Sequence, residues 1–239
     1  MPGLGTLINV IAVVVGGLSG SLVGRLFDEG QQRAVNVACG VSVLFIGIAG
    51  AMEGMLAIEG GGITSARAMF VVLCLALGTV VGELFRIEDR FEQFGTWLKM
   101  RTGNARDERF VDAFVTTSLT VCIGAMAIVG AIQDGMLGDF STLAIKSVLD
   151  LVIVAVMTSS MGKGCAFSAI PIAVLEGSVT LLSSLLRPLM TDVAMEKLSL
   201  IGSILIFCVG VNLVWGKTIR VANMLPAVVL AVVAAFLPL

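Results

Sequence analysis

The chain has 239 residues, of which 57% are hydrophobic and 13% are charged, and its net charge is -2. Soluble domains average about 45–50% apolar and about 25% charged residues, so this composition excludes a water-soluble fold and predicts a membrane protein. The charge balance, with no basic run, gives no indication of nucleic-acid binding, and we expect a single transmembrane domain over residues 1–239.

Eight apolar segments approach the roughly 20 residues that a membrane-crossing helix needs. They span residues 4–26, 35–56, 66–86, 110–133, 142–161, 166–187, 199–216 and 221–239. No basic residue precedes the first segment, so we interpret it as a retained span and not as a cleaved signal peptide. The last segment contains Pro226, which leaves open a seven-span version with this segment partly at the membrane surface. The predicted fold class is therefore all-α, a polytopic integral membrane protein with about eight transmembrane helices.

The loops between these segments differ in their content of Lys and Arg. Eleven of the fifteen basic residues fall on one side of the predicted membrane order. They are Arg25, Arg33, Arg86, Arg90, Lys99, Arg101, Arg106, Arg109, Lys163, Lys217 and Arg220. Because basic loops tend to stay in the cytoplasm, we expect this side to be cytoplasmic and both termini to lie outside.

Glycines form a repeated pattern in the first and third segments. Gly16, Gly20 and Gly24 follow one another at intervals of four residues, and so do Gly78 and Gly82. Glycines at this spacing let another helix backbone approach closely, so we assign them to helix packing, within one chain or between copies. A backbone-lined ion path is the alternative. A homo-oligomer is expected, because so few spans seldom enclose a complete pathway.

Two helical hairpins of the sequence resemble each other. The stretch GGLSGSLVGRLF of the first segment resembles LALGTVVGELF of the third, and VSVLFIGIAGAMEGML of the second resembles VCIGAMAIVGAIQDGML of the fourth. Duplicated architecture is common in transporters. This internal two-helix repeat favours transport over an enzymatic role.

The longest loop, residues 87–109, has an amphipathic pattern. Phe91, Phe94, Trp97 and Leu98 recur at helical spacing, with charged residues between them. This pattern is typical of a helix that lies at the membrane interface. We predict a cytoplasmic interfacial helix that anchors the loop, with partner docking as the alternative.

The hairpin of residues 143–186 contains the candidate transport path, because ionisable residues at membrane depth are rare and usually face a cavity or a partner. Lys146 and Asp150 are four residues apart, so they share a helix face and can pair, although Lys146 can also snorkel to the surface. Glu176 lies near the middle of its span, where burial favours the neutral form. A neutral Glu176 suits a proton-coupled carrier, or simply a hydrogen bond to a neighbouring helix.

A turn rich in hydroxyls and glycine joins the two segments of this hairpin. It begins with Thr158, Ser159 and Ser160 and continues to Gly164. Irregular backbone at membrane depth is tolerated only where it is buried in protein or lines a water-filled cavity. The turn is therefore either a re-entrant tip of the path or an ordinary surface loop.

Three further polar residues complete the candidate path. Gln133 and Asp134 lie at the outer end of the fourth segment, where they could line a vestibule. Asn212 lies in the seventh segment, where an interhelical hydrogen bond is the alternative. The sequence has no His, no Cys-X-X-Cys pair and no nucleotide-binding loop, so we expect no metal, no cofactor and no enzymatic activity.

Long stretches of the chain resemble the bacterial YqgA/YdfK-like family, domain of unknown function 554. They include GELFRIEDRFEQFGTWLK, FVDAFVTTSLTVCIGAMAIVGAIQDGMLGDFSTLAIKSVLD and CAFSAIPIAVLEGSVTLL. The resemblance runs from the first span to the last. It implies a multi-pass protein of the bacterial inner membrane. Transport is the most specific function that the resemblance suggests, and it supplies no substrate and no functional residue.

These features together predict a transporter or channel for an ion or a small polar solute, with a path near residues 143–186. The alternative is a non-transporting scaffold or sensor that works through helix–helix assembly with a partner. The sequence leaves open the substrate, the coupling ion, the choice between channel and carrier, and the number of subunits.

Overall fold

The computed structural model describes residues 2–59, 62–65, 67–123, 125–189 and 191–236. The fold is all-α, as predicted, apart from one short hairpin of two strands. The elements are α1 (Leu4–Gly24), α2 (Glu29–Met55), β1 (Leu56–Glu59), β2 (Gly62–Ser65), α3 (Ala68–Phe85), α4 (Ile87–Arg101), α5 (Phe110–Cys122), α6 (Ala125–Leu137), α7 (Ser141–Met161), the 3-10 helix η1 (Lys163–Ser168), α8 (Ala169–Leu181), α9 (Ser183–Leu186), η2 (Arg187–Leu189), α10 (Asp192–Trp215), α11 (Val221–Met224), α12 (Pro226–Val233) and η3 (Ala234–Phe236).

The number of membrane crossings is confirmed only in part. Within the described residues, six helices are long and apolar enough to cross: α1, α2, α3, α7, η1 with α8, and α10. The pair α5 and α6, whose axes differ by 62°, makes a seventh if the two form one span. The last apolar segment, Val221–Phe236, is shorter than these helices. The count of eight therefore stays a prediction.

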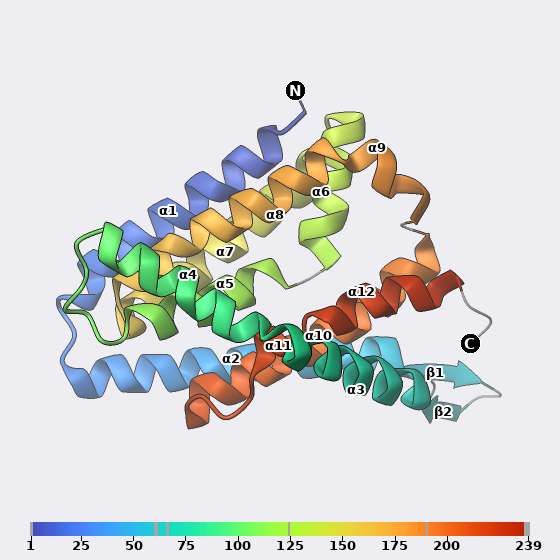
Figure 1. Cartoon of the computed structure of the whole chain (residues 1–239), viewed down its shortest axis with the longest axis horizontal. Coiled ribbons are helices and arrows are strands. Elements are labelled where there is room, and N and C mark those ends of the chain that lie inside the picture. The colour runs from blue at the N-terminus through green and yellow to red at the C-terminus, as the bar shows by residue number, and fades with distance from the viewer. Residues whose placement is uncertain (1, 60–61, 66, 124, 190, 237–239) are drawn as a thin grey trace.

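The helices form two groups, which Figure 1 shows on opposite sides of the molecule: α1, α7 and α8 in one, and α2, α3 and α10 in the other. In the first group, Gly16 and Gly20 of α1 face Leu151 and Ala155 of α7, so the two helices run parallel. A Cβ atom at Gly20 would lie 2.2 Å from the Ala155 carbonyl oxygen. The predicted glycine groove is thus filled by a helix of the same chain.

In the second group, the glycines of α3 also allow close packing, but against segments that run antiparallel to α3. Gly78 and Gly82 of α3 face Ala227 and Asn223 at the end of the chain, and a Cβ at Gly82 would lie 1.8 Å from the Asn223 carbonyl oxygen. Because the two predicted hairpins pack on different partners, α7 and α12, the internal repeat remains a prediction from the sequence.

Several helices begin earlier than the apolar segments that predicted them. α2 begins at Glu29 and not near residue 35, because Asp28 and Gln31 form a reciprocal capping box that satisfies free N–H groups of the first turn. α10 begins at Asp192 and not near residue 199, and the Thr191 side chain caps it. The early residues of these helices include polar and charged side chains, Glu29 to Arg33 in α2 and Asp192, Glu196 and Lys197 in α10, and these lower the local hydropathy.

The loop of residues 87–109 is helical only over α4, Ile87–Arg101, and the rest is a turn-rich connection. Its apolar residues divide between two environments. Leu98 is buried, and the Phe91 and Phe94 rings lie 6.3 Å and 5.8 Å from the Phe114 ring of α5, whereas Trp97 is exposed. The helix therefore packs one face on the protein and presents Trp97 outward, and its location at the membrane interface stays a prediction.

The strands β1 and β2 connect α2 to α3 and were not expected from the sequence. They pair antiparallel, with Leu56 opposite Ser65 and Glu59 opposite Gly62. The segment between the two apolar helices is rich in glycine, which favours a tight turn over a helical connection.

The predicted hydroxyl turn is mostly helical. α7 continues through Thr158, Ser159 and Ser160 to Met161, and only Gly162 leaves the helix, with φ of +104°. Gly162 can adopt this angle because it has no Cβ atom. The chain then enters η1 at once, so the hydroxyls belong to the last turn of α7 and not to a loop.

Candidate functional site

Four polar side chains meet between α1, α7 and α8 in the interior of the first helix group. Lys146 pairs with Asp150 one turn along α7, and its ammonium lies 3.8 Å from a carboxylate oxygen of Glu176 on α8. The Asn9 side chain on α1 donates to both acids, at 3.1 Å to Asp150 and 2.7 Å to Glu176. Asn9 and Glu176 have no exposed surface, and Lys146 and Asp150 are also buried. We call these four residues the buried ionic cluster.

The break between α5 and α6 explains how the structure accommodates a buried ammonium. Lys146 Nζ donates to the Val121 carbonyl oxygen at 2.8 Å. Val121 lies in the last turn of α5, where carbonyl groups lack a donor from the next turn of the helix. The negative end of the helix dipole also favours a cation there. Lys146 is therefore held by a carbonyl group as well as by two carboxylates.

Asp134 of α6 lies beside this cluster and caps α1 from outside the helix. Its carboxylate accepts hydrogen bonds from the backbone N–H groups of Gly5 at 2.9 Å and Thr6 at 3.3 Å. A helix N-terminus attracts an anion because its first N–H groups are free and its dipole is positive there. The Thr6 and Thr180 hydroxyls, 3.1 Å apart, add another link between α1 and α8.

Acceptors outnumber donors in this region. Two carboxylates, those of Asp150 and Glu176, flank one ammonium, and the Asp134 carboxylate lies at the N-terminus of α1, so negative charge is in excess when all three are ionised. One oxygen each of Asn9, Asp134 and Glu176 is buried and has no hydrogen-bond partner among the described residues. Buried polar atoms are usually satisfied, so these three oxygens mark a place that can accept a proton, a water molecule or a cation.

One layer of apolar side chains closes the buried ionic cluster on its inner side. Val13, Val154 and Ile172 are fully buried and pack together with Val121 and Ala169. Each of the first three lies about one turn from a cluster residue on its own helix, so the layer is displaced from the cluster by about 6 Å along the helices. Water and ions have no polar partner within this layer.

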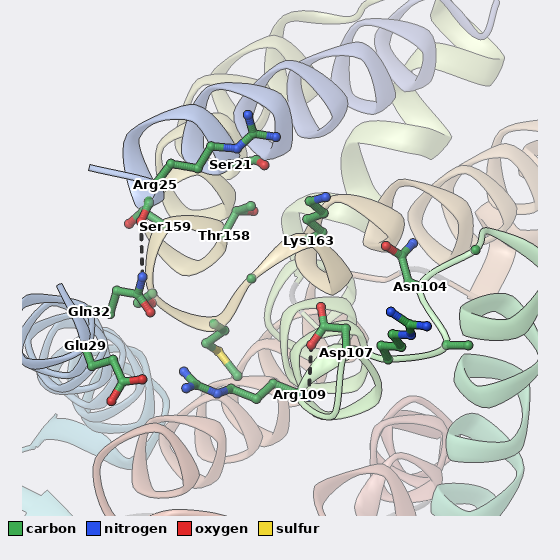
Figure 2. Close-up of a pocket in the computed structure, with 17 residues that line it drawn as sticks. Ser21, Arg25, Glu29, Gln32, Asn104, Asp107, Arg109, Thr158, Ser159 and Lys163 are labelled. Atoms are coloured by element: carbon green, nitrogen blue, oxygen red, sulfur yellow. Dashed lines mark hydrogen bonds between the residues drawn. The ribbon is translucent and has the colours of Figure 1, made fainter. Parts of the chain in front are cut away.

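Beyond this layer a cavity of about 870 Å³ opens at the end of α7 (Figure 2). It is lined by the last turn of α1, the first turn of α2, the loop before α5, and the junction of α7 with η1. Thr158 and Ser159 line it, and Figure 2 shows them between Arg25 of α1 and Lys163 of η1. Thr158 is two turns from Asp150 along α7, a distance of about 12 Å. We call this cavity the vestibule.

The structure divides the predicted path residues into three sets. Lys146, Asp150 and Glu176 meet in the buried ionic cluster, with Asp134 next to it. Thr158, Ser159 and Ser160 line the vestibule. Gln133 instead accepts a hydrogen bond from the Thr142 hydroxyl at 2.6 Å, which joins α6 to α7.

Asn212 lies at neither site. Its side chain closes the turn after α10 by donating to the Ile219 carbonyl at 2.7 Å and accepting from the backbone N–H groups of Thr218 and Ile219. It holds the connection to α11 and has no contact with the buried ionic cluster. Its partners follow it within seven residues, so its role is local and not interhelical.

Two groups of site residues escaped the sequence prediction. Asn9 is absent from the predicted path, although a single amide in an apolar span is a usable signal of a buried polar partner. Arg25, Arg106 and Arg109 were treated only as indicators of orientation. They come from separate loops, so no local pattern shows that they share the vestibule.

No group of three or more His, Cys, Asp or Glu residues that could hold a metal ion occurs within the described part of the chain. The cluster combines an ammonium, an amide and carboxylates, and it contains no nucleophile paired with a base. This set of groups can bind ions and exchange protons.

The chain is similar to known proteins along almost its whole length. The model of the family described as "Protein of unknown function (DUF554)" matches residues 4–236. The chain is 28% identical over 232 residues to the uncharacterized protein YqgA of Escherichia coli (strain K12), with 95% of this chain and 94% of that protein covered. It is 22% identical over 232 residues to the uncharacterized membrane protein YdfK of Bacillus subtilis (strain 168), with 97% and 95% covered. No solved structure matches the chain.

Proposed function

We propose that this chain, which belongs to the DUF554 family of proteins of unknown function, is a membrane transporter or channel for an ion or a small polar solute and not an enzyme. Its path runs between α1, α7 and α8, from the vestibule to the buried ionic cluster. The observation that carries this proposal is that one apolar layer separates a buried set of ionisable groups from an open polar cavity.

The broken helix supports the same function. Transporters commonly bind their substrates and ions where a membrane helix is interrupted, because the interruption frees backbone groups inside the protein. Here the free carbonyl group of Val121 holds the Lys146 ammonium. A site that already accommodates a cation between a carbonyl and two carboxylates is suited to exchanging that contact for another ion.

The apolar layer gives the proposed path a closed state. Val13, Val154 and Ile172 sit on three different helices, so a small shift of α1 against α7 and α8 would separate them. We place the vestibule on the cytoplasmic side of a bacterial inner membrane, because the loops around it are rich in Arg and Lys. The buried ionic cluster then lies in the outer half of the membrane.

The alternative, a scaffold that assembles through its glycine faces, has less support. Gly16, Gly20 and Gly24 contact α7, and Gly78 and Gly82 contact the last helices of the same chain. These surfaces are therefore occupied before any partner arrives. A homo-oligomer that forms through other surfaces remains compatible with the proposed path.

A thermal-shift screen of the detergent-purified protein tests the proposal. Inorganic ions, amino acids and organic acids would be titrated across pH, since a ligand that binds only the folded state raises the melting temperature with its concentration. The solute that gives a shift would then be followed into proteoliposomes. We expect Asp150→Asn and Glu176→Gln to abolish uptake while the purified proteins still elute as folded species.

Asp139→Asn serves as the matched control. It removes one carboxylate at the N-terminal end of α7, but Asp139 is exposed and its side chain bonds, within the described ranges of the chain, to Ser141 alone. Uptake should survive this change. Uptake that is equally intact in Asp150→Asn, Glu176→Gln and Asp139→Asn would place the path elsewhere and refute the proposal.

A further inference from the structure

We propose that the vestibule is a binding site for a small, water-soluble oxyanion that bears a phosphate or carboxylate group, and that such anions are the substrate class that enters the path. The second part of this inference rests on the proposed transport function. The first part, binding, stands on the vestibule alone.

The charges around the vestibule are unbalanced. Four basic residues line it, together with only two acidic ones, Glu29 and Asp107. The basic residues are Arg25, Arg106, Arg109 and Lys163. None of these four forms an ion pair with any acid in the described ranges of the chain. A cavity with excess positive charge raises the local concentration of anions and favours their entry.

Two other basic residues at this end of the molecule form ion pairs with acids. Elsewhere at the same end, Arg220 pairs with Glu83 at 3.1 Å, and Lys217 pairs with Glu88 at 3.0 Å and with Glu92. Partial burial opposes the charge of Lys217, but its hydrogen bonds to Glu92 and Glu88 raise its pKa. Arg33, Arg86, Arg90, Lys99 and Arg101 at this end form no ion pair within the described residues either. What distinguishes the four basic residues of the vestibule is that they line one cavity together.

Neutral polar side chains also line the vestibule, namely Ser21, Thr158, Ser159 and Asn104. The Thr158 hydroxyl is buried and has no hydrogen-bond partner among the described residues, whereas the Ser159 hydroxyl donates to the Val156 carbonyl oxygen and the Asn104 amide donates to Thr102. Figure 2 shows Thr158 and Ser159 between Arg25 and Lys163, with Asn104 and Arg109 on the side of the loop before α5. Guanidinium groups bind carboxylates and phosphates through paired hydrogen bonds, and hydroxyls add further donors to the same oxygens.

The size and composition of the cavity indicate a small polar ligand. Its volume of about 870 Å³ falls within the usual range for small-molecule sites, about 300–1,000 Å³. The lining of the vestibule consists of glycine, hydroxyl, amide and charged residues and one alanine, and Met161 is its one large apolar side chain. A lipid would need an apolar groove for its chains beside the basic groups, and the described lining offers none.

Binding of sodium phosphate and sodium succinate, measured by calorimetry on the full-length protein in a non-ionic detergent, tests the site. We expect Arg25→Gln combined with Lys163→Gln to weaken binding by roughly tenfold or more, since both cations flank the hydroxyls. The control combines Lys99→Gln with Arg101→Gln, which removes the same charge from α4 at the same end of the molecule but outside the vestibule. Its binding should equal that of the unaltered protein.

Melting temperatures in nanodiscs distinguish a free anion from a lipid headgroup. Nanodiscs of phosphatidylcholine alone are compared with nanodiscs that also contain phosphatidylglycerol. Stabilisation by phosphatidylglycerol that depends on Arg25 and Lys163, without binding of phosphate or succinate, would overturn the proposal in favour of a lipid site. Binding that falls equally in the α4 control would also overturn it, because the effect would then be general electrostatics.

The outcomes separate this inference from the transport proposal. Phosphate or succinate binding in the vestibule with no uptake into proteoliposomes would support the site and refute transport of these anions. Uptake of a cation that depends on Asp150, with no anion binding, would refute this inference and leave the transport path intact.

Discussion

Lys146 is the residue on which the proposed site depends. It joins three elements at once, because its ammonium contacts Asp150 of α7, Glu176 of α8 and the Val121 carbonyl group of α5. Removing two charges from water is expensive, and their attraction repays the cost only when the remaining hydrogen bonds are also satisfied. The structure meets this condition in part: the Val121 carbonyl accepts from Lys146 and Asn9 donates to Asp150, whereas one oxygen of Glu176 has no partner among the described residues.

At this scale we predict that Lys146→Met destabilises the protein by about 3–5 kcal/mol, because it leaves buried carboxylates without their cation. The double change Lys146→Met with Asp150→Leu should recover most of this loss, since it replaces the pair with apolar groups. Melting temperatures in detergent measure both effects. If the double variant is no more stable than Lys146→Met alone, the unpaired Asp150 carboxylate is not the cause of the lost stability.

The sequence predicted the contact between Lys146 and Asp150 because it is local, four residues along one helix. The other contacts of the cluster join distant residues. Asn9 lies 141 residues from Asp150 and 167 residues from Glu176. No periodicity within one segment specifies which face of α1 meets α7 and α8, so only the packed structure shows Asn9 between the two acids.

Helices of this chain pack where glycine removes a side chain. On α1, the line from Gly16 to Gly24 lets the helix lie directly on the backbone of α7. This close approach also brings Asn9 to the buried ionic cluster and Val13 to the apolar layer. The glycine pattern was readable from the sequence, whereas the identity of the helix that fills it was not.

At the scale of the element, we predict that Gly20→Ala lowers stability by about 1–3 kcal/mol, because the new Cβ atom would overlap the Ala155 carbonyl group. Gly177→Ala on α8 is the matched control. A Cβ atom at Gly177 would meet nothing within 4 Å, so this variant should be unchanged or slightly more stable. Melting temperatures compare the two.

The contact between α1 and α7 also predicts whether Gly20→Ala impairs folding or assembly. Because α1 and α7 belong to the same chain, Gly20→Ala should reduce the yield of folded protein and leave its oligomeric state unaltered. A variant that folds with a normal melting temperature but changes its size on a gel-filtration column would assign the groove to an interface between copies.

The whole molecule has two chemically different ends. Most basic residues gather at the end with the vestibule, while the buried ionic cluster lies toward the other. The directions of the packed helices agree with alternating crossings, since α1 runs parallel to α7 and α3 runs antiparallel to α12. The side on which the C-terminal end lies depends on whether the short apolar segment Val221–Phe236 crosses the membrane.

At this scale we predict the accessibility of single cysteines introduced into a cysteine-free version of the chain. With a membrane-impermeant maleimide applied to whole cells, Asp139→Cys should react, and Arg106→Cys should react only after permeabilisation, because basic loops are cytoplasmic. Phe236→Cys should behave like Asp139→Cys if Val221–Phe236 crosses the membrane. Labelling of Phe236→Cys only after permeabilisation would give a seven-span protein with this segment on the inner side.

The sequence by itself determined the features that depend on neighbouring residues. Runs of apolar residues gave the all-α membrane class, basic loops gave an expected orientation, and four-residue spacings gave the glycine faces and the pair of Lys146 with Asp150. Tertiary structure decided what each face meets: α7 on the glycines of α1, the end of α5 at Lys146, and an apolar layer between the buried ionic cluster and the vestibule. The physical reason is that local patterns fix only which side of a helix is available, whereas the partner is chosen by the packing of all the helices together.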